Sequence, residues 1–347
     1  MSTREDVIQA FLDAQGWGGA ERSLLAADAS FRRYLRLQRD GERAVLMDAP
    51  PPEDVRPFER VAALLLRLGL SAPRPLAVEA AAGLLLLEDL GDATFTRVLA
   101  RGDDEAGLYR LAIDTLIALH RGWSADLPGA GELPPYDEAR LLDEALLLTD
   151  WFLPALRGRP TPAPLREAYI EAWRAVFPAA QALPETLVLR DYHVDNLMIL
   201  EGRAGVAACG LLDFQDAVRG SPAYDLVSLL EDARRDIAPE LAEEMFERYR
   251  AAFEALDGAQ LRAAMSVLGA QRSAKIIGIF TRLDRRDRKP GYLRHIPRVW
   301  RLLQGDLAHP ALAPVRAWFD REIPVAERIA PPRETVPRET APRETAP

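Results

Sequence analysis

Two carboxylates and one carboxamide follow short apolar segments in the middle of the chain. Asp191 and Asn196 come after the apolar run 187–189, and Asp213 comes after the apolar run 210–212. Phosphoryl transfer from a magnesium nucleotide needs a carboxylate that orients and deprotonates the attacking hydroxyl, and hard oxygen ligands for the metal. Asp191 fits the role of the base. Asn196 and Asp213 fit the metal, because Mg²⁺ binds carboxamide and carboxylate oxygens while it keeps several waters.

The elements that position these groups are of two kinds. Before residue 91, period-2 alternation and the Asp40-Gly41 turn predict an antiparallel sheet with strands at residues 31–38, 44–47, 76–79 and 84–87. Helices are predicted at residues 3–12, where Thr3 and Asp6 form a capping box, and at residues 58–68. From residue 103 the spacing is mainly helical, and it is interrupted by the short strands that carry the candidate residues.

These patterns predict an α+β chain of two lobes. A sheet-containing lobe is expected at residues 1–91 and a mostly helical lobe at residues 92–325. From residue 326 the chain becomes rich in proline and repeats Pro-Arg-Glu-Thr, so we expect a disordered tail there.

The segment from Leu189 to Asn196 resembles the catalytic loop of the kinase-like superfamily. In that superfamily His-Arg-Asp is followed by four residues and then Asn, and a later Asp opens the metal-binding motif; here Leu189 stands where histidine is usual. The segment 221–226 is similar to one in aminoglycoside phosphotransferase relatives, where an Asp begins a helix and braces the catalytic loop. The resemblance implies that role for Asp225, and it implies the two-lobed protein-kinase-like fold.

The similarity is greatest to the anomeric sugar kinases of cell-wall recycling. It is carried by the segments 28–34, 47–51, 190–197, 213–217 and 224–230, and it covers most of residues 20 to 320. The resemblance implies that ATP and Mg²⁺ are the cofactors. It also implies phosphorylation of the C1 hydroxyl of N-acetylmuramate or N-acetylglucosamine in peptidoglycan recycling.

The nucleotide site implied by this resemblance departs from the superfamily at the phosphates. Met47 stands where a lysine is expected, and Glu59 is the candidate for the glutamate that pairs with that lysine. Arg32 or Arg33 could supply the missing positive charge. The phosphate loop is poor in glycine, which leaves Ser30 and its neighbours to present backbone amides. The hinge between the lobes is expected at Glu88 to Leu90, whose backbone groups would pair with adenine.

Several polar residues around the loop are candidates for the sugar site, each with a structural alternative. His193 contacts the substrate or braces the loop, Asp195 and Asp216 accept sugar hydroxyls or support other groups, and Arg190 has the alternative of a salt bridge within the loop. Glu231 and Arg235 belong to a predicted helix whose default is a solvated face, yet a lactyl carboxylate needs a cation, which Arg235 could supply. Tyr224 lies in the similar segment, whereas Trp151 and Trp173 are expected in the core or on the surface.

Composition excludes several classes of protein. The 347 residues carry 44 Lys and Arg against 53 Asp and Glu, a net charge of -9, which argues against a nucleic-acid partner. Cys209 is the only cysteine, so a disulfide framework and a cysteine-based zinc site are excluded. The charged start and the lack of an apolar run of about 20 residues predict a cytoplasmic protein without a membrane partner. We expect a monomer that binds ATP and a small amino sugar.

Three other functions stay open at this point. A kinase of another small alcohol, such as an aminoglycoside, choline or a different hexose, would use the same catalytic residues. A metal-dependent phosphohydrolase could use Asp191, His193 and Asp195 without a nucleotide. A nucleotide-binding pseudokinase is suggested by Met47, although the intact set of Asp191, Asn196 and Asp213 argues against it.

Overall fold

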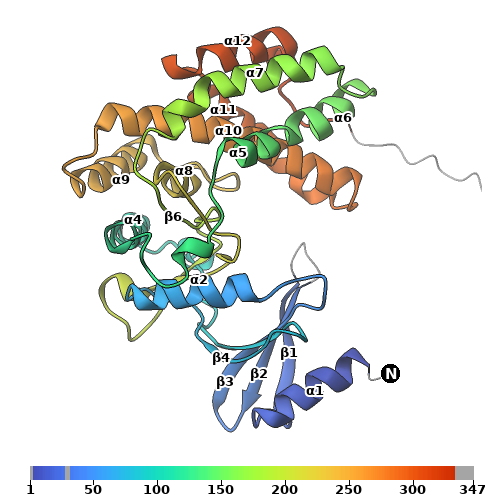
Figure 1. The fold of residues 1–347 in the computed structure, drawn as a ribbon, viewed down its shortest axis with the longest axis vertical. Coiled ribbons are helices and arrows are strands. Elements are labelled where there is room, and N and C mark those ends of the chain that lie inside the picture. Colours follow the sequence, from blue (N-terminus) through green and yellow to red (C-terminus); the bar gives the residue numbers. More distant parts are fainter. Residues whose placement is uncertain (1–2, 28–31, 333–347) are drawn as a thin grey trace, which may run out of the picture. The chain divides into compact units, whose positions relative to one another are not determined.

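A computed structural model describes residues 3–27 and 32–332, which form two compact units (Figure 1). The first unit joins Met1–Asp137 to Ala179–Leu268, and the second joins Glu138–Pro178 to the chain from Gly269 onward. These units do not coincide with a boundary at residue 91. The N-terminal sheet and the segments that carry the candidate catalytic residues fall in the same unit, so their contacts can be described together.

The strands all belong to the first unit. In the described part of the chain they are β1 (Glu21–Ala27), β2 (Arg33–Arg39), β3 (Glu42–Asp48), β4 (Pro75–Glu79), β5 (Leu84–Glu88), β6 (Thr186–Val188), β7 (Leu197–Ile199), β8 (Cys209–Leu211) and β9 (Val218–Gly220).

Helices make up most of the remainder. They are α1 (Arg4–Ala14), α2 (Arg56–Arg67), α3 (Phe95–Leu99), α4 (Glu105–Gly122), α5 (Glu138–Ala145), α6 (Leu153–Arg157), α7 (Ala163–Ala180), α8 (Ala223–Leu230), α9 (Pro239–Ala251), α10 (Gly258–Arg285), α11 (Ile296–Leu307) and α12 (Ala313–Glu322).

The N-terminal sheet has five antiparallel strands in the order β1-β2-β3-β5-β4. The β2–β3 hairpin turns at Asp40 and Gly41, which both have a positive φ of 50° and 83°. A two-residue hairpin turn of this kind matches the twist of the strands it joins, and Asp-Gly tolerates it. The hairpin expected from the sequence is therefore confirmed.

Each face of the sheet packs on its own helix. The capping box of Thr3 and Asp6 starts α1, as predicted, and Ile8 and Leu12 of α1 pack with Leu46 of β3 and Leu86 of β5. Side chains one position along a strand point the opposite way, so Val45 and Leu87 face the other side, where Phe58 of α2 joins them around a pocket. Figure 1 shows α1 and α2 on opposite sides of the strands.

Two short hairpin-like pairs carry the catalytic candidates. β6 pairs with β9, and β7 pairs with β8, both antiparallel. The side chain of Tyr192, between β6 and β7, is buried and its hydroxyl donates to the carbonyl oxygen of Ala112 in α4 at 2.7 Å. The catalytic segment is thereby anchored on α4.

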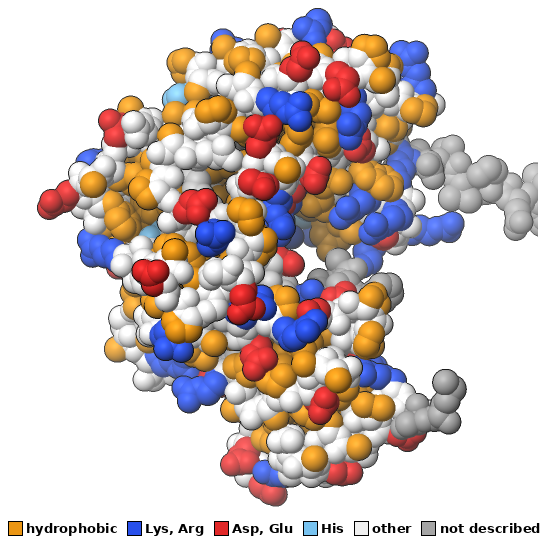
Figure 2. Space-filling view, in the orientation of Figure 1, with side chains coloured by type: hydrophobic (Ala, Val, Ile, Leu, Met, Phe, Trp, Pro, Cys, Tyr) orange, Lys and Arg blue, Asp and Glu red, His pale blue; other side chains and the backbone are white. Residues whose placement is uncertain are grey.

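The second unit is helical and has an aromatic core. Trp173 of α7 is fully buried and stacks on Phe177, with ring centroids 5.6 Å apart, while Tyr169 packs on Trp318 at 4.4 Å. Trp173 is thus a core residue, as expected. Within the described residues, none of the helices combines the length and the apolar character needed to cross a bilayer. On the face drawn in Figure 2, basic side chains are interspersed with acidic ones.

Candidate active site

A buried carboxylate holds the turn that follows β6. Asp225, in the first turn of α8, is fully buried and accepts hydrogen bonds from the backbone N–H groups of Leu189 at 2.6 Å and Arg190 at 2.8 Å. Arg190 has a φ of 71°, which is uncommon for a residue with a side chain. The two hydrogen bonds stabilise this turn, and Asp191 comes directly after it. Asp225 therefore has the geometry that a bracing residue needs.

We expect Asp225→Ala to lower the free energy of unfolding by roughly 3 kcal/mol, because two backbone N–H groups lose their acceptor inside the protein. Urea denaturation followed by circular dichroism measures the change. Asp104→Ala is the matched control, since Asp104 accepts one backbone N–H, from Gly107, at an exposed helix start, where a cap is worth about 1 kcal/mol. Equal losses in the two variants would contradict a special role for Asp225.

Asn196 is oriented so that its amide oxygen is left for a cation. Its amide nitrogen donates to the carbonyl oxygen of Asp191 at 2.9 Å and lies 3.4 Å from Oδ2 of Asp213. A carboxamide whose nitrogen is held by a carbonyl presents its oxygen as the remaining acceptor. Asp213 has a φ of 57° and is exposed, and its Oδ1 accepts from Nε2 of Gln215 at 2.8 Å. A carboxamide and a carboxylate side chain this close together are suitable ligands for Mg²⁺.

The β7–β8 pair sets the spacing of these two residues. Leu197 pairs with Leu211 in the ladder, and the backbone N–H of Leu212 donates to the carbonyl oxygen of Asn196 at 2.9 Å. Asn196 and Asp213 thus come from the same end of one strand pair. The sequence prediction that these two side chains lie together agrees with this geometry.

A pocket of about 420 Å³ opens between the sheet and this strand pair. Its apolar walls include Val45, Phe58, Leu87, Met198 and Leu212. One edge consists of Glu88, the last residue of β5, and the linker from Asp89 to Asp92, and another edge includes Asp195, Asn196 and Asp213. An apolar slot with polar groups at its edges suits a planar base with a charged extension.

The linker after β5 is where the hinge was expected. Glu88 and Leu90 both line the pocket, and the side chain of Glu88 forms an ion pair with Arg203. The backbone N–H of Glu88 donates to the carbonyl oxygen of Arg74 at 2.9 Å. Within the described chain, no hydrogen bond uses the backbone N–H of Leu90, which leaves it for a ligand.

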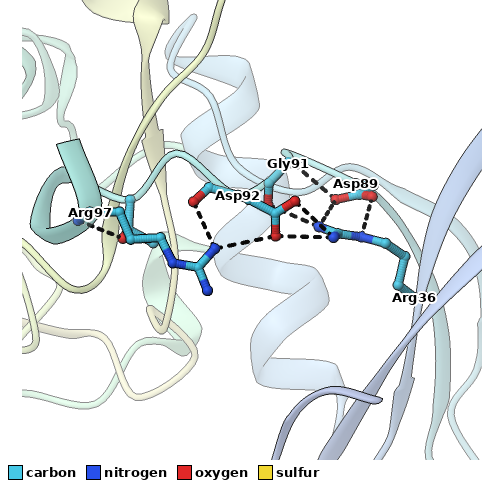
Figure 3. A network of polar contacts seen from close by, with 6 residues as sticks. Arg36, Asp89, Gly91, Asp92 and Arg97 are labelled. Carbon is cyan, nitrogen blue, oxygen red and sulfur yellow. Dashed lines mark hydrogen bonds and ion pairs between the residues drawn. The ribbon is translucent and has the colours of Figure 1, made fainter. Parts of the chain in front are cut away.

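A chain of alternating charges joins β2 to this linker (Figure 3). The guanidinium of Arg36 contacts Oδ2 of Asp89 at 2.7 Å and Oδ2 of Asp92 at 2.9 Å, and it donates to the carbonyl oxygen of Gly91 at 3.1 Å. Arg97 donates to the carbonyl oxygen of Asp92 at 3.1 Å. Burial lowers the pKa of Arg36, but its hydrogen bonds with Asp89 and Asp92 outweigh this and raise the pKa above its ordinary value. The network fixes the linker against the sheet.

Arg32 and Arg33, the two candidates for replacing the lysine, both form ion pairs with carboxylates of the protein. Met47 is buried in β3, where it pairs with Tyr34 and Leu85. Arg32 forms an ion pair with Glu53, with Nε of Arg32 2.8 Å from Oε2 of Glu53. Glu59 is exposed on α2, because that position lies on the outer side of the helix.

Arg33 is likewise occupied, since Nε of Arg33 lies 2.6 Å from Oδ2 of the buried Asp48. Burial lowers the pKa of Arg32, but its hydrogen bond to Glu53 and the charge of that carboxylate, with smaller contributions from Tyr34 and Asp216, together raise the pKa above its ordinary value. Ser30, which was expected to present its amide to the phosphates, lies outside the described residues. Arg97 is the basic residue among those described as lining the pocket.

Two of the sugar-site candidates, His193 and Asp195, lie in the catalytic segment itself. Asp195 lines the pocket, its Oδ1 accepts from the hydroxyl of Thr96, and Nε of Arg234 lies 3.6 Å from its Oδ2. His193 is buried, and its Nε2 lies 3.4 Å from the amide nitrogen of Asn196. The location of His193 favours its alternative role in bracing the loop.

The remaining candidates are tied into the surrounding structure. Nη1 of Arg190 donates to the backbone oxygen of Asp216 at 3.3 Å, and its guanidinium lies 5.8 Å from the ring centre of Tyr136. The ring of Tyr224 is buried against that same Tyr136, with centroids 4.9 Å apart. Asp216 itself is exposed. Tyr224 thus contributes packing here.

Glu231 and Arg235 were expected on a helix, but α8 ends at Leu230 with Glu231 as its C-cap. The guanidinium of Arg235 contacts Oε1 of Glu105 at 2.7 Å. Burial lowers the pKa of Arg235, but its hydrogen bond to Glu105, the charge of that carboxylate and the nearby Tyr109 together raise the pKa above its ordinary value. Arg235, the candidate for binding a lactyl carboxylate, is therefore paired with a residue of α4, whereas the side chain of its neighbour Arg234 lies near Asp195 of the catalytic segment.

The cysteine does not supply a nucleophile. Cys209 is fully buried in β8, and burial raises the pKa of its thiol to about 12. A thiol with that pKa is almost entirely protonated near neutral pH, and the thiolate is the reactive form.

Comparison with known proteins agrees with this chemistry. An N-acetylmuramate/N-acetylglucosamine kinase of Caulobacter vibrioides is 40% identical over 94% of this chain and 99% of that protein. The enzyme of the same name from Pseudomonas aeruginosa is 38% identical over 86% of this chain and 89% of that protein. In the solved streptomycin-ATP-APH(2")-IIa ternary complex, the protein has a TM-score of 0.58 and 16% identity, covering 90% of this chain and 98% of that one.

The fold is therefore the kinase-like fold of the aminoglycoside phosphotransferases, as the sequence predicted. The family match begins at the first residue of β1 and runs past α9, over residues 21–262, which include the pocket, the catalytic segment and Asp225. With a match of this extent and near full-length relatives, the chain belongs to the phosphotransferase enzyme family.

Proposed function

We propose that the chain transfers the γ-phosphoryl group of ATP to the C1 hydroxyl of N-acetylmuramate or N-acetylglucosamine. The observation that carries this proposal is the shared edge of the pocket, where Asn196 and Asp213 lie beside Asp195 and where Asn196 is bonded to Asp191. A nucleotide base in the apolar slot would have its phosphates directed to this edge. The names of the relatives support an amino sugar as the acceptor.

In the proposed reaction, the sugar oxygen attacks the γ-phosphorus in line. A new O–P bond forms, the bond from phosphorus to the β,γ-bridging oxygen breaks, and ADP leaves with that electron pair. Asp191 orients the hydroxyl and accepts its proton. Asn196 and Asp213 would hold Mg²⁺, which neutralises charge on the phosphates when it is bound. Asp225 keeps the segment in place through its two backbone contacts.

The test is an ADP-release assay with amino sugars, aminoglycosides, choline and hexoses, followed by phosphorus NMR of the product. We expect turnover with N-acetylmuramate or N-acetylglucosamine and a phosphate on the anomeric carbon. Preferred turnover of another alcohol would assign a different acceptor. Hydrolysis of phosphoesters without ATP, or nucleotide binding with no turnover of any acceptor, would contradict the proposal.

A further inference from the structure

We propose that Arg234 determines specificity for acidic acceptors by binding the carboxylate of the lactyl group of N-acetylmuramate. This inference rests on the proposed function and adds the residue that would distinguish the two amino sugars. N-acetylmuramate differs from N-acetylglucosamine by a lactyl ether at C3, so the distinction between them is a single negative charge on a short arm.

Arg234 lies beside the catalytic segment. Its Nε is 3.6 Å from Oδ2 of Asp195, which lines the pocket, directly precedes Asn196 and follows Asp191 by four residues. In the proposed complex, a sugar whose anomeric hydroxyl is at Asp191 would extend past Asp195, because both residues belong to the same short catalytic segment. The other oxygen of Asp195 accepts from Thr96, which holds the carboxylate on α3.

The guanidinium of Arg234 has donors to spare. The side chain is 37% exposed, and among the described residues it donates no hydrogen bond, since 3.6 Å is beyond hydrogen-bond distance. Its backbone is nevertheless held, because its N–H donates to Oδ1 of the buried Asp232 at 2.7 Å. Because the backbone is held and the N–H donors of the guanidinium make no hydrogen bond in the described residues, the side chain can bind a carboxylate through two parallel hydrogen bonds.

The neighbouring Arg235, in contrast, is already held in a short ion pair. Arg235 contacts Glu105 at 2.7 Å, so an incoming carboxylate would have to displace an existing short ion pair. Arg234 has only a long contact with the half-buried carboxylate of Asp195, and a long contact between partly solvated charges is a weak interaction. Charge also favours a cation here, because Asp195 and Asp213 at the pocket edge would repel an acidic acceptor.

The experiment measures kcat and KM of the wild type and Arg234→Met with N-acetylmuramate, its methyl ester and N-acetylglucosamine. We expect the variant to raise KM for N-acetylmuramate by about 10- to 100-fold. The values for the neutral methyl ester and for N-acetylglucosamine should change by less than about twofold, and the wild type's preference for the free acid over its ester should disappear. Arg110→Met is the control, because Arg110 is a comparably exposed arginine paired with Glu244 on the same unit.

Equal losses with the charged and the neutral sugars would show a structural role for Arg234 and overturn the inference. Unchanged kinetics, or a charge-selective loss in Arg235→Met in place of Arg234→Met, would also overturn it. A wild type that phosphorylates N-acetylglucosamine but not N-acetylmuramate would overturn it while leaving the kinase function intact. A wild type that phosphorylates neither sugar would remove the proposed function, and the inference with it.

Discussion

Asp191→Asn is expected to lower kcat by about three orders of magnitude while the affinity for ATP stays within about twofold of the wild type. The amide keeps the shape of the side chain but cannot accept the proton of the attacking hydroxyl, and a positioned base contributes typically 10²- to 10⁴-fold. ATP binding should persist because Asp191 is not among the residues that line the pocket. ADP release gives kcat, and titration calorimetry with a non-hydrolysable ATP analogue gives the affinity.

The control for this variant is Asp114→Asn, which removes a surface carboxylate that pairs with Arg248. Its turnover should match the wild type. Near wild-type turnover of Asp191→Asn would refute the assignment of the base. A parallel loss of ATP affinity would instead show that the substitution disturbs Asn196, whose amide nitrogen is bonded to the backbone of residue 191.

Asp213→Ala is expected to abolish the effect of Mg²⁺ on nucleotide affinity. In the wild type, ATP should bind at least roughly 100-fold more tightly with Mg²⁺ than with EDTA, since the metal links the phosphates to the protein. The variant retains only the amide oxygen of Asn196 in this pair, so its two affinities should become nearly equal. Titration calorimetry in the two buffers measures the difference.

Asp103→Asn serves as the control for the lost charge, because Asp103 is exposed and lies outside the pocket-lining residues. It should keep the full dependence on Mg²⁺. An unchanged metal dependence in Asp213→Ala would count against its role as a ligand. If Asn196→Ala lost the effect of Mg²⁺ on nucleotide affinity while Asp213→Ala kept it, Asn196 would be the metal ligand and Asp213 would not.

Elements whose conformation depends on residues close together in sequence could be predicted from the sequence alone. The capping box of α1 and the Asp40-Gly41 turn depend on residues within a few positions of one another. The catalytic segment is similar, because Asp191 and Asn196 are held by one short loop and the hydrogen bond between them is local. Patterns of this length can be read directly.

β1 was not predicted because its strand conformation depends on a partner. Glu21–Ala27 shows no regular alternation, Leu24 is 67% exposed, and the strand pairs on one side only, with β2. β9 is a three-residue strand that pairs with β6, and the paired residues are 30 to 34 positions apart in sequence. Edge and very short strands of this kind are specified by tertiary pairing more than by their own residues.

The charge network and the choice between neighbouring arginines were also beyond the sequence. Arg36 meets Asp89 and Asp92 across more than 50 residues, and all three belong to segments that look like ordinary strand and turn. Arg234 and Arg235 are adjacent, and the loop after α8 directs one to Asp195 and the other to Glu105. The sequence predicted a helix over these residues, whereas α8 ends at Leu230. The partners of Arg234 and Arg235 could therefore be identified only from the structure.

The pairing of β7 with β8 places the two candidate metal ligands and the connection between the strands at opposite ends of the strand pair. Backbone hydrogen bonds at the open end of this pair set how far apart Asn196 and Asp213 begin, whereas the connection from residue 200 to residue 208 lies at the opposite end. A change in the length of that connection would therefore leave the hydrogen bonds that set the distance between the two ligands in place. The same connection carries Arg203, which pairs with Glu88 at the pocket, so a change there would act on the nucleotide side of the site before it acted on the two ligands.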